Sequence, residues 1–215
     1  MAIADRRARE KESLRQKILD TARDLFAAHG YEGVTLRKIA EAIEYAPGTI
    51  YGYFRDKGEL LRALCVADWE EFEQSFPREA RVADPLGAIR AQGKAYIQFG
   101  LAHPNQYRLM FMTAKPAEML ELDAETLAKR GDPAHDGYAL LRSSVQAAID
   151  AGLLREEMRD PELVAQTLWA GVHGMASLEI ALGTDPWIEW APTEARADAM
   201  LDVLMRGLAR ERVRP

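Results

Sequence analysis

Apolar positions recur along this chain at intervals of three and four residues, the spacing expected of helix faces. The earliest clear stripe predicts a helix over residues 12–29 and consists of Leu14, Ile18, Leu19, Ala22, Leu25 and Phe26. Gly30 follows it, where a helix C-terminus favours a residue with left-handed backbone. Long runs of strict apolar–polar alternation are absent, so we expect little or no sheet. The pattern predicts an all-α protein.

A second helix, a tight turn and a short third helix are predicted between residues 35 and 54. Thr35 can cap the second helix through its side-chain oxygen. The buried stripe of that helix would comprise Leu36, Ile39, Ala40 and Ile43. We expect the turn at Tyr45-Ala46. Pro47 suits the first turn of the third helix, because its missing N–H is not needed there.

Acidic caps mark the later helix starts. Asp56, with Glu59 three residues on, predicts a fourth helix that opens with a capping box. The pairs Asp84-Pro85 and Asp160-Pro161 each place an acidic cap before a first-turn proline. His103-Pro104 ends one apolar helix and begins another. We expect helices near 161–183 and 193–210, and a loop with one exposed helix over 115–135.

The short third helix and its neighbours carry side chains suited to the DNA major groove. Gly48 gives clearance, and the methyl group of Thr49 can contact a thymine methyl. Tyrosine hydroxyls and the N–H groups opening the fourth helix can bind phosphates. Ile50 and Phe54, four residues apart, should face inward and fix the helix. The candidate DNA contacts are Thr35, Arg37, Pro47, Gly48, Thr49, Tyr51, Tyr53 and Lys57. The alternative is a packed helical hairpin that binds nothing.

Charge is divided unevenly along the chain. The 215 residues carry a net charge of −6, yet residues 1–62 hold 12 Lys and Arg against 10 Asp and Glu. The remaining residues therefore carry −8. A mildly basic front and an acidic body are compatible with phosphate contact through a local patch, although chance scatter would give the same numbers.

Cysteine and hydropathy favour a cytoplasmic protein. Cys65 is the single cysteine, so an internal disulfide is impossible, which suits a reducing compartment. No apolar run approaches the roughly 20 residues of a membrane span. The N-terminus has no apolar signal-peptide core, and we expect no membrane partner.

The N-terminal residues resemble the DNA-binding domain of the tetracycline-repressor (TetR) family of bacterial regulators. Three stretches carry the resemblance: Ile18-x-x-x-Ala22-x-x-Leu25-Phe26-x-x-x-Gly30-Tyr31, Thr35-x-x-x-Ile39-Ala40, and Gly48-Thr49-Ile50-Tyr51-x-Tyr53-Phe54-x-x-Lys57-x-x-Leu60. Pro47, Gly52 and Tyr53 depart from the family's common residues. The resemblance implies a three-helix, helix-turn-helix DNA-binding domain over 1–62, joined to a helical-bundle effector-binding and dimerisation domain over 63–215.

Two C-terminal segments resemble a subgroup of this family with a Trp-x-x-x-His-Gly signature. They are His103-Pro104-x-x-Tyr107-Arg108-Leu109-Met110-Phe111 and Leu168-Trp169-Ala170-Gly171-Val172-His173-Gly174. Aromatic residues around them are candidates to line an apolar effector cavity. The ligand-binding candidates are Tyr96, Phe99, Tyr107, Phe111, Trp169 and His173. The alternative is a plain hydrophobic core, with His173 as a hydrogen-bonded core histidine.

The last two predicted helices are apolar over much of their surface, which favours a contact with a second copy. Gly171 would allow close approach of another helix. The candidate dimer residues are Val164, Leu168, Gly171, Met175, Leu201, Leu204 and Leu208. Ordinary packing within one subunit is the alternative.

No motif predicts catalysis, a metal site or a cofactor. The four histidines lack metal-ligand spacing, and nucleophile-elbow and phosphate-loop patterns are absent. We therefore expect a homodimeric repressor of a palindromic double-stranded operator, released by a small, largely apolar effector. Two alternatives stay open: a regulator whose body answers a partner protein or nothing, and an enzyme on a helical scaffold.

Overall fold

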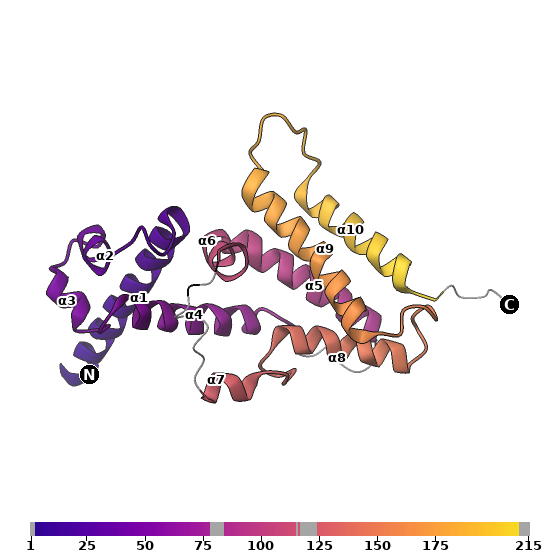
Figure 1. The fold of residues 1–215 in the computed structure, drawn as a ribbon, viewed down its shortest axis with the longest axis horizontal. Coiled ribbons are helices and arrows are strands. Elements are labelled where there is room, and N and C mark those ends of the chain that lie inside the picture. Colours follow the sequence, from indigo (N-terminus) through magenta and orange to yellow (C-terminus); the bar gives the residue numbers. More distant parts are fainter. Residues whose placement is uncertain (1–2, 78–83, 115, 117–123, 211–215) are drawn as a thin grey trace. The chain divides into compact units, whose positions relative to one another are not determined.

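The computed structural model describes residues 3–77, 84–114, 116 and 124–210. Within these ranges the regular elements are helices, joined by turns and one isolated antiparallel bridge between Leu154 and Ala209 (Figure 1). The chain divides into two compact units. The first unit comprises Met1–Glu70 and Asn105–Leu122, and the second comprises Glu71–Pro104 and Asp123–Pro215. The all-α prediction is confirmed.

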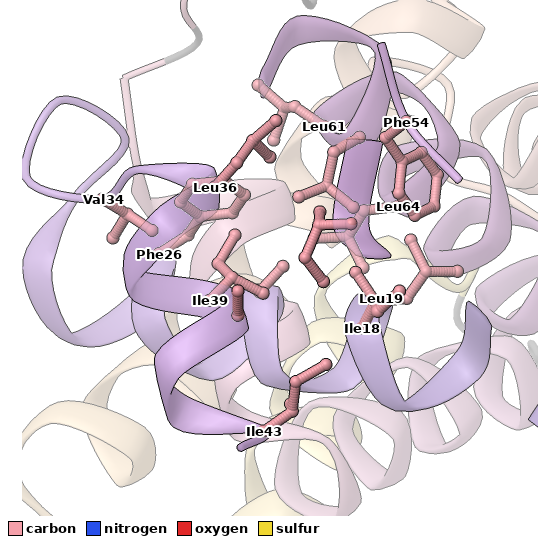
Figure 2. Close-up of a cluster of buried hydrophobic side chains, with 14 of the residues drawn as sticks. Ile18, Leu19, Phe26, Val34, Leu36, Ile39, Ile43, Phe54, Leu61 and Leu64 are labelled. Carbon is pink, nitrogen blue, oxygen red and sulfur yellow. The ribbon is translucent and has the colours of Figure 1, made fainter. Parts of the chain in front are cut away.

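The first unit is built on the N-terminal helices. Its elements are α1 (Ile3–His29), α2 (Leu36–Ala42), α3 (Pro47–Tyr51), the start of α4 (Lys57–Gln74), most of α6 (Pro104–Tyr107) and the π-helix η1 (Arg108–Met112). Their apolar faces meet in one core, where Ile18 and Leu19 of α1 lie against Ile39 of α2 and Leu64 of α4 (Figure 2). The predicted stripes of the first two helices are largely buried in this core.

Helix starts and stops in the first unit follow the expected chemistry. Thr35 caps α2 by accepting the Lys38 N–H at 3.2 Å. Gly30 ends α1 with a positive φ of 69°. Pro47 occupies the first turn of α3 without a side-chain cap. These features confirm the predicted boundaries of α2 and α3.

Two elements of the first unit differ from the sequence prediction. Helix α1 begins at Ile3 and not near residue 12, because its first turns are made of helix-forming charged residues that leave no apolar stripe. Exposed pairs such as Arg6–Glu10 line those turns. The segment after Pro104 passes from α6 into the π-helix η1, and Leu109 joins the core of the first unit. The predicted division at residue 62 does not anticipate this return of the chain.

The second unit is a bundle of longer helices. Its elements are the end of α4, α5 (Pro85–Ala102), α7 (Ala124–Lys129), α8 (Gly137–Asp150), α9 (Pro161–Leu182) and α10 (Thr193–Leu208). Asp84 and Asp160 cap α5 and α9 as predicted, and Asp136 caps α8. Part of the predicted loop at 115–135 lies outside the described residues, and α7 is its exposed helix.

Close helix contacts in the second unit depend on two glycines. A Cβ on Gly93 of α5 would lie 2.8 Å from Cδ2 of Leu201 on α10. A Cβ on Gly171 of α9 would lie 2.6 Å from Cδ1 of Leu204 on α10. Ordinary carbon contacts are about 3.5–4.0 Å, so only glycine allows these approaches without a shift.

Candidate functional site

The turn between α2 and α3 is set by backbone hydrogen bonds. The Tyr45 N–H donates to the Ala40 carbonyl at 2.9 Å, and the Glu44 N–H donates to the Glu41 carbonyl at 3.1 Å. This pair of bonds is the Schellman pattern, which requires a left-handed residue after the helix. Glu44 supplies it with φ 63°. The turn therefore begins earlier than the predicted Tyr45-Ala46.

Helix α3 is anchored by one face and accessible on the other. Ile50 is fully buried and Phe54 is nearly so, as expected for the inward face. Pro47 and Gly48 are exposed, and Tyr51 is 59% exposed. Thr49 is partly exposed, and Tyr53 packs at the edge of the core. The candidate groove-reading residues therefore lie on or beside an open helix face.

The start of α4 combines a cap with an internal tether. The Asp56 carboxylate accepts the Glu59 N–H at 2.7 Å, and the Glu59 carboxylate accepts the Arg55 N–H at 2.7 Å. The first of these bonds lowers the pKa of Asp56, with help from the Arg55 side chain. Lys57 Nζ donates to the Tyr31 carbonyl at 2.9 Å and lies 3.9 Å from the centre of the Tyr31 ring.

These contacts give Lys57 a structural task that its sequence position did not predict. Its ammonium group fastens the loop after α1 to the start of α4, and it keeps donors for a phosphate. Arg37 forms an exposed ion pair with Glu41 at 2.9 Å, of a kind that contributes little stability. Both cations remain candidate phosphate contacts.

Four ligand-binding candidates gather in the second unit. The Trp169 indole N–H donates to the Tyr96 hydroxyl at 3.0 Å, and that hydroxyl lies 3.3 Å from His173 Nδ1. Phe99 joins them through Phe72, whose ring centre is 5.0 Å from that of Phe99 and 5.6 Å from that of Tyr96. Burial lowers the pKa of His173 and so favours its neutral form.

The other two ligand-binding candidates lie in the first unit. Tyr107 is fully buried, and its ring centre is 5.0 Å from that of Phe111. Phe111 in turn packs edge-on against Trp69 at 5.4 Å. The sequence grouped them with the C-terminal aromatics because they are near Tyr96 in the chain; residues 105–114 are part of the first unit, whereas Tyr96 is part of the second.

Family models match both halves of the chain. Residues 18–64 match the model for bacterial regulatory proteins of the tetR family, and residues 89–204 match that for the tetracyclin repressor-like C-terminal domain. This chain belongs to the TetR family. It is therefore a helix-turn-helix transcriptional repressor that binds operator DNA, and it is not an enzyme.

Two similar proteins within the family are repressors. The chain is 30% identical to the transcriptional repressor AcnR of Corynebacterium efficiens over 145 residues, 67% of this chain and 70% of AcnR. It is 40% identical to the repressor Rv1474c of Mycobacterium tuberculosis over 111 residues, 52% of this chain and 53% of Rv1474c. The fold is also that of AibR in complex with isovaleryl coenzyme A and operator DNA, with a TM-score of 0.68. That alignment covers 89% of this chain and 97% of AibR at 21% identity.

The candidate dimer residues of this TetR-family chain lie mostly inside its own subunit. Side chains buried in the second unit are Val164, Leu168, Met175, Leu201 and Leu208. Gly171 and Leu204 contact each other across α9 and α10. Apolar periodicity marked the faces of these helices that pack within the subunit, including against α5 and α8, because a helix buried on one side shows the same stripe.

Different faces of the same two helices are exposed. On α9 the outward stripe consists of Leu163, Thr167, Ala170, Leu178 and Ala181. Gly174 falls in the same stripe, and a Cβ there would meet no atom within 4 Å. On α10 the outward stripe consists of Ala195, Ala199, Val203 and Gly207. Both stripes are mostly apolar, and alanine and glycine make up much of each.

Across the residues that the structure describes, no group of three or more His, Cys, Asp or Glu side chains is arranged to hold a metal ion. None of the described helices combines the length and apolarity needed to cross a membrane.

Proposed function

We propose that this repressor is a homodimer that places two α3 helices in successive major grooves of a near-palindromic operator, and that a small ligand in the second unit releases it. The observation that carries the proposal is α3 itself. Ile50 and Phe54 lock it into the first unit, while Pro47, Gly48 and Tyr51 remain exposed. A rigid helix with a slender outer face is what close approach to base edges requires.

Each candidate DNA contact has a distinct role. Pro47 and the Thr49 methyl group contact thymine methyls, and Gly48 gives the helix clearance. Hydroxyls of Tyr51 and Tyr53 donate to phosphates, which set the register without reading sequence. The remaining phosphate contacts are Thr35, Arg37 and Lys57.

Footprinting on DNA that flanks the repressor's own gene tests this assignment. Thr49→Ala should reduce discrimination at one base pair of each half-site, by less than the roughly 1–3 kcal/mol of a bidentate base contact. Tyr51→Phe keeps the ring and should weaken operator and random DNA alike. Thr184→Ala, on the exposed loop after α9, is the matched control. A footprint left unchanged by both α3 variants would show that α3 does not read the operator.

The outward stripes of α9 and α10 are the proposed dimer surface. Their apolar and small side chains would let two copies of these helices pack closely, with Ala170 and Gly174 at the closest approach. Ala170→Glu places a charge in this surface and should give monomers that lose the operator. Gln98→Glu, on an exposed position of α5, is the control. Sedimentation velocity reads the mass, and an unchanged dimer in Ala170→Glu would rule out this surface.

The aromatic group in the second unit is the proposed effector site. Tyr96, Trp169 and His173 form a hydrogen-bonded chain beside Phe72 and Phe99. Trp169-x-x-x-His173-Gly174 is the signature of the subgroup to which we assign the C-terminal domain. An apolar wall with a few polar groups is typical of ligand pockets. Tyr107 and Phe111 lie in the first unit, so we do not include them in this group.

A ligand releases DNA only through its preference for a conformation that does not fit the operator. A coupling of about 1–3 kcal/mol would change operator affinity roughly 5–150-fold. A thermal-shift screen with small apolar compounds tests the site, with isovaleryl coenzyme A included because AibR binds it. A hit must also release DNA and must weaken in Trp169→Phe. If no compound does so, the second candidate, a regulator that answers a protein partner, is favoured.

A further inference from the structure

A groove runs along the first turns of α1 and ends at the turn between α2 and α3. It has a volume of about 480 Å³ and is lined by Arg6, Arg9, Glu10, Ser13, Leu14, Lys17 and Tyr45. At its inner end, Lys17 Nζ donates to the Ile43 carbonyl at 3.4 Å and lies 5.7 Å from the centre of the Tyr45 ring. These contacts tie the groove to the residues that immediately precede α3.

The groove is basic and rich in donors. Three cations face one carboxylate, and that carboxylate pairs with Arg6 at 3.4 Å while both side chains remain largely exposed. Such a pair is weak and exchanges readily for another anion. Arg9 donates through Nε to the Asp5 carbonyl. Ser13 and the 43%-exposed Tyr45 add hydroxyl donors.

The position of the groove relative to α3 is fixed within the first unit. Ile18 and Leu19, which directly follow Lys17 on α1, are fully buried with Ile39 and Ile50. In Figure 1 the N-terminal end of α1 lies on the same side of the first unit as α3. A duplex that meets the exposed face of α3 therefore passes close to the side chains of the groove.

We propose that this groove is a second DNA contact, which binds the sugar-phosphate backbone beside each half-site through Arg6 and Arg9. This inference rests on the proposed reading of DNA by α3. Guanidinium groups bind phosphate oxygens in a bidentate manner, and such contacts position a protein without reading sequence. The groove therefore strengthens binding to all duplexes and does not change the preferred operator.

Salt dependence gives the sharpest test. Each phosphate contact contributes about −0.9 to the slope of log K against log salt concentration, or about eightfold in affinity at 0.1 M salt. In a dimer that uses both grooves, Arg6→Gln/Arg9→Gln removes four phosphate contacts, so it should flatten the slope by about 3.6 and weaken operator and scrambled duplex by the same factor. Glutamine keeps the helix propensity of α1. Glu10→Gln should act in the opposite direction and tighten both duplexes.

Arg7→Gln/Lys11→Gln is the matched control, because it removes two charges from the same turns of α1 but outside the groove lining. It should leave the slope within a few tenths of wild type. A wild-type slope in Arg6→Gln/Arg9→Gln, or an equal change in the control, would overturn the groove as a contact. Competition by free pyrophosphate in the absence of any change in slope would assign the groove to small anions and would overturn the proposal too.

Failure of this inference is distinguishable from failure of the proposed function. If α3 does not read DNA, wild-type protein will show no preference for the operator over the scrambled duplex, whatever the groove does. If only the groove is misassigned, wild type will prefer the operator, Thr49→Ala will weaken that preference, and the salt slope of Arg6→Gln/Arg9→Gln will equal that of wild type.

Discussion

Glu44 holds a left-handed backbone, φ 63°, at the end of α2. A residue with a Cβ pays about 1–2 kcal/mol for that conformation, whereas glycine adopts it freely but loses more entropy on folding. We expect Glu44→Gly to raise the free energy of unfolding by about 0.5–1 kcal/mol, and Glu44→Ala to leave it nearly unchanged. Urea denaturation measures both. A loss of stability in Glu44→Gly would mean that the glutamate side chain itself stabilises the turn.

Arg23 and Asp68 form the most buried ion pair described in the first unit. Arg23 on α1 donates through Nη2 to Asp68 on α4 at 2.7 Å, where the Asp68 side chain is 1% exposed. Removing one partner leaves a buried charge, so Arg23→Met should cost about 3–5 kcal/mol. Arg23→Met/Asp68→Leu should lose less than Arg23→Met alone. Denaturant unfolding of wild type and the two variants tests this, and a double variant that loses as much stability as Arg23→Met, or more, would contradict it.

Helices were predictable where an apolar stripe coincided with a cap. Thr35, Asp84 and Asp160 each begin a helix where the sequence placed it. The first turns of α1 have no stripe, and the π-helix η1 differs from an α-helix in hydrogen bonding and not in its apolar pattern. The residue pattern within one helix does not show which hydrogen bonds and tertiary contacts form, and these decide both cases.

The candidate site, too, was predictable only where local residues determine it. The outer face of α3 follows from Ile50 and Phe54, since two inward anchors fix which residues point outward. The tether of Lys57 to the Tyr31 carbonyl joins residues 26 positions apart and has no local signal. The outward stripe of α9 likewise could be recognised only once the positions of α5 and α8 were known.

Packing of α5 against α10 depends on the missing side chain of Gly93. Its added Cβ would lie 2.8 Å from Leu201 Cδ2 and 3.3 Å from Val172 Cγ1, both in buried side chains. Gly93→Ala should therefore cost about 1–3 kcal/mol through overpacking, despite the better helix propensity of alanine. Leu201→Ala alone should cost about 2–5 kcal/mol through the cavity that it leaves.

A double-mutant cycle identifies the contact. The cavity of Leu201→Ala accepts the new methyl group, so Gly93→Ala/Leu201→Ala should lose at least 0.5 kcal/mol less than the sum of its parts, as neighbouring sites do. Pairing Gly93→Ala with Leu208→Ala, also buried on α10, should be additive. Equal coupling in both cycles would mean that α10 shifts as a whole and that the close approach at Gly93 is not the cause.

For the whole molecule, a dimer with one rigid α3 in each subunit must impose a fixed spacing on its operator. Twofold symmetry in the protein requires a matching dyad in DNA, with half-site centres one helical turn, about 10–10.5 base pairs, or a multiple apart. Inserting five base pairs between half-sites turns one of them to the opposite side of the duplex. We expect this insertion to reduce affinity to that of a single half-site, measured by electrophoretic mobility shift.

An insertion of ten base pairs returns both half-sites to the same face of the duplex but leaves them farther apart. It therefore distinguishes a dimer whose two α3 helices have a fixed spacing from one whose spacing can adjust. Because α3 is held by the core of the first unit through Ile50 and Phe54, it cannot move independently to follow a displaced half-site. We therefore expect the ten-pair insertion to bind about as weakly as the five-pair insertion. Recovery of tight binding with the ten-pair insertion would show that the α3 helices of the two subunits can change their spacing freely. Affinity indifferent to both insertions would show that single subunits bind the half-sites independently.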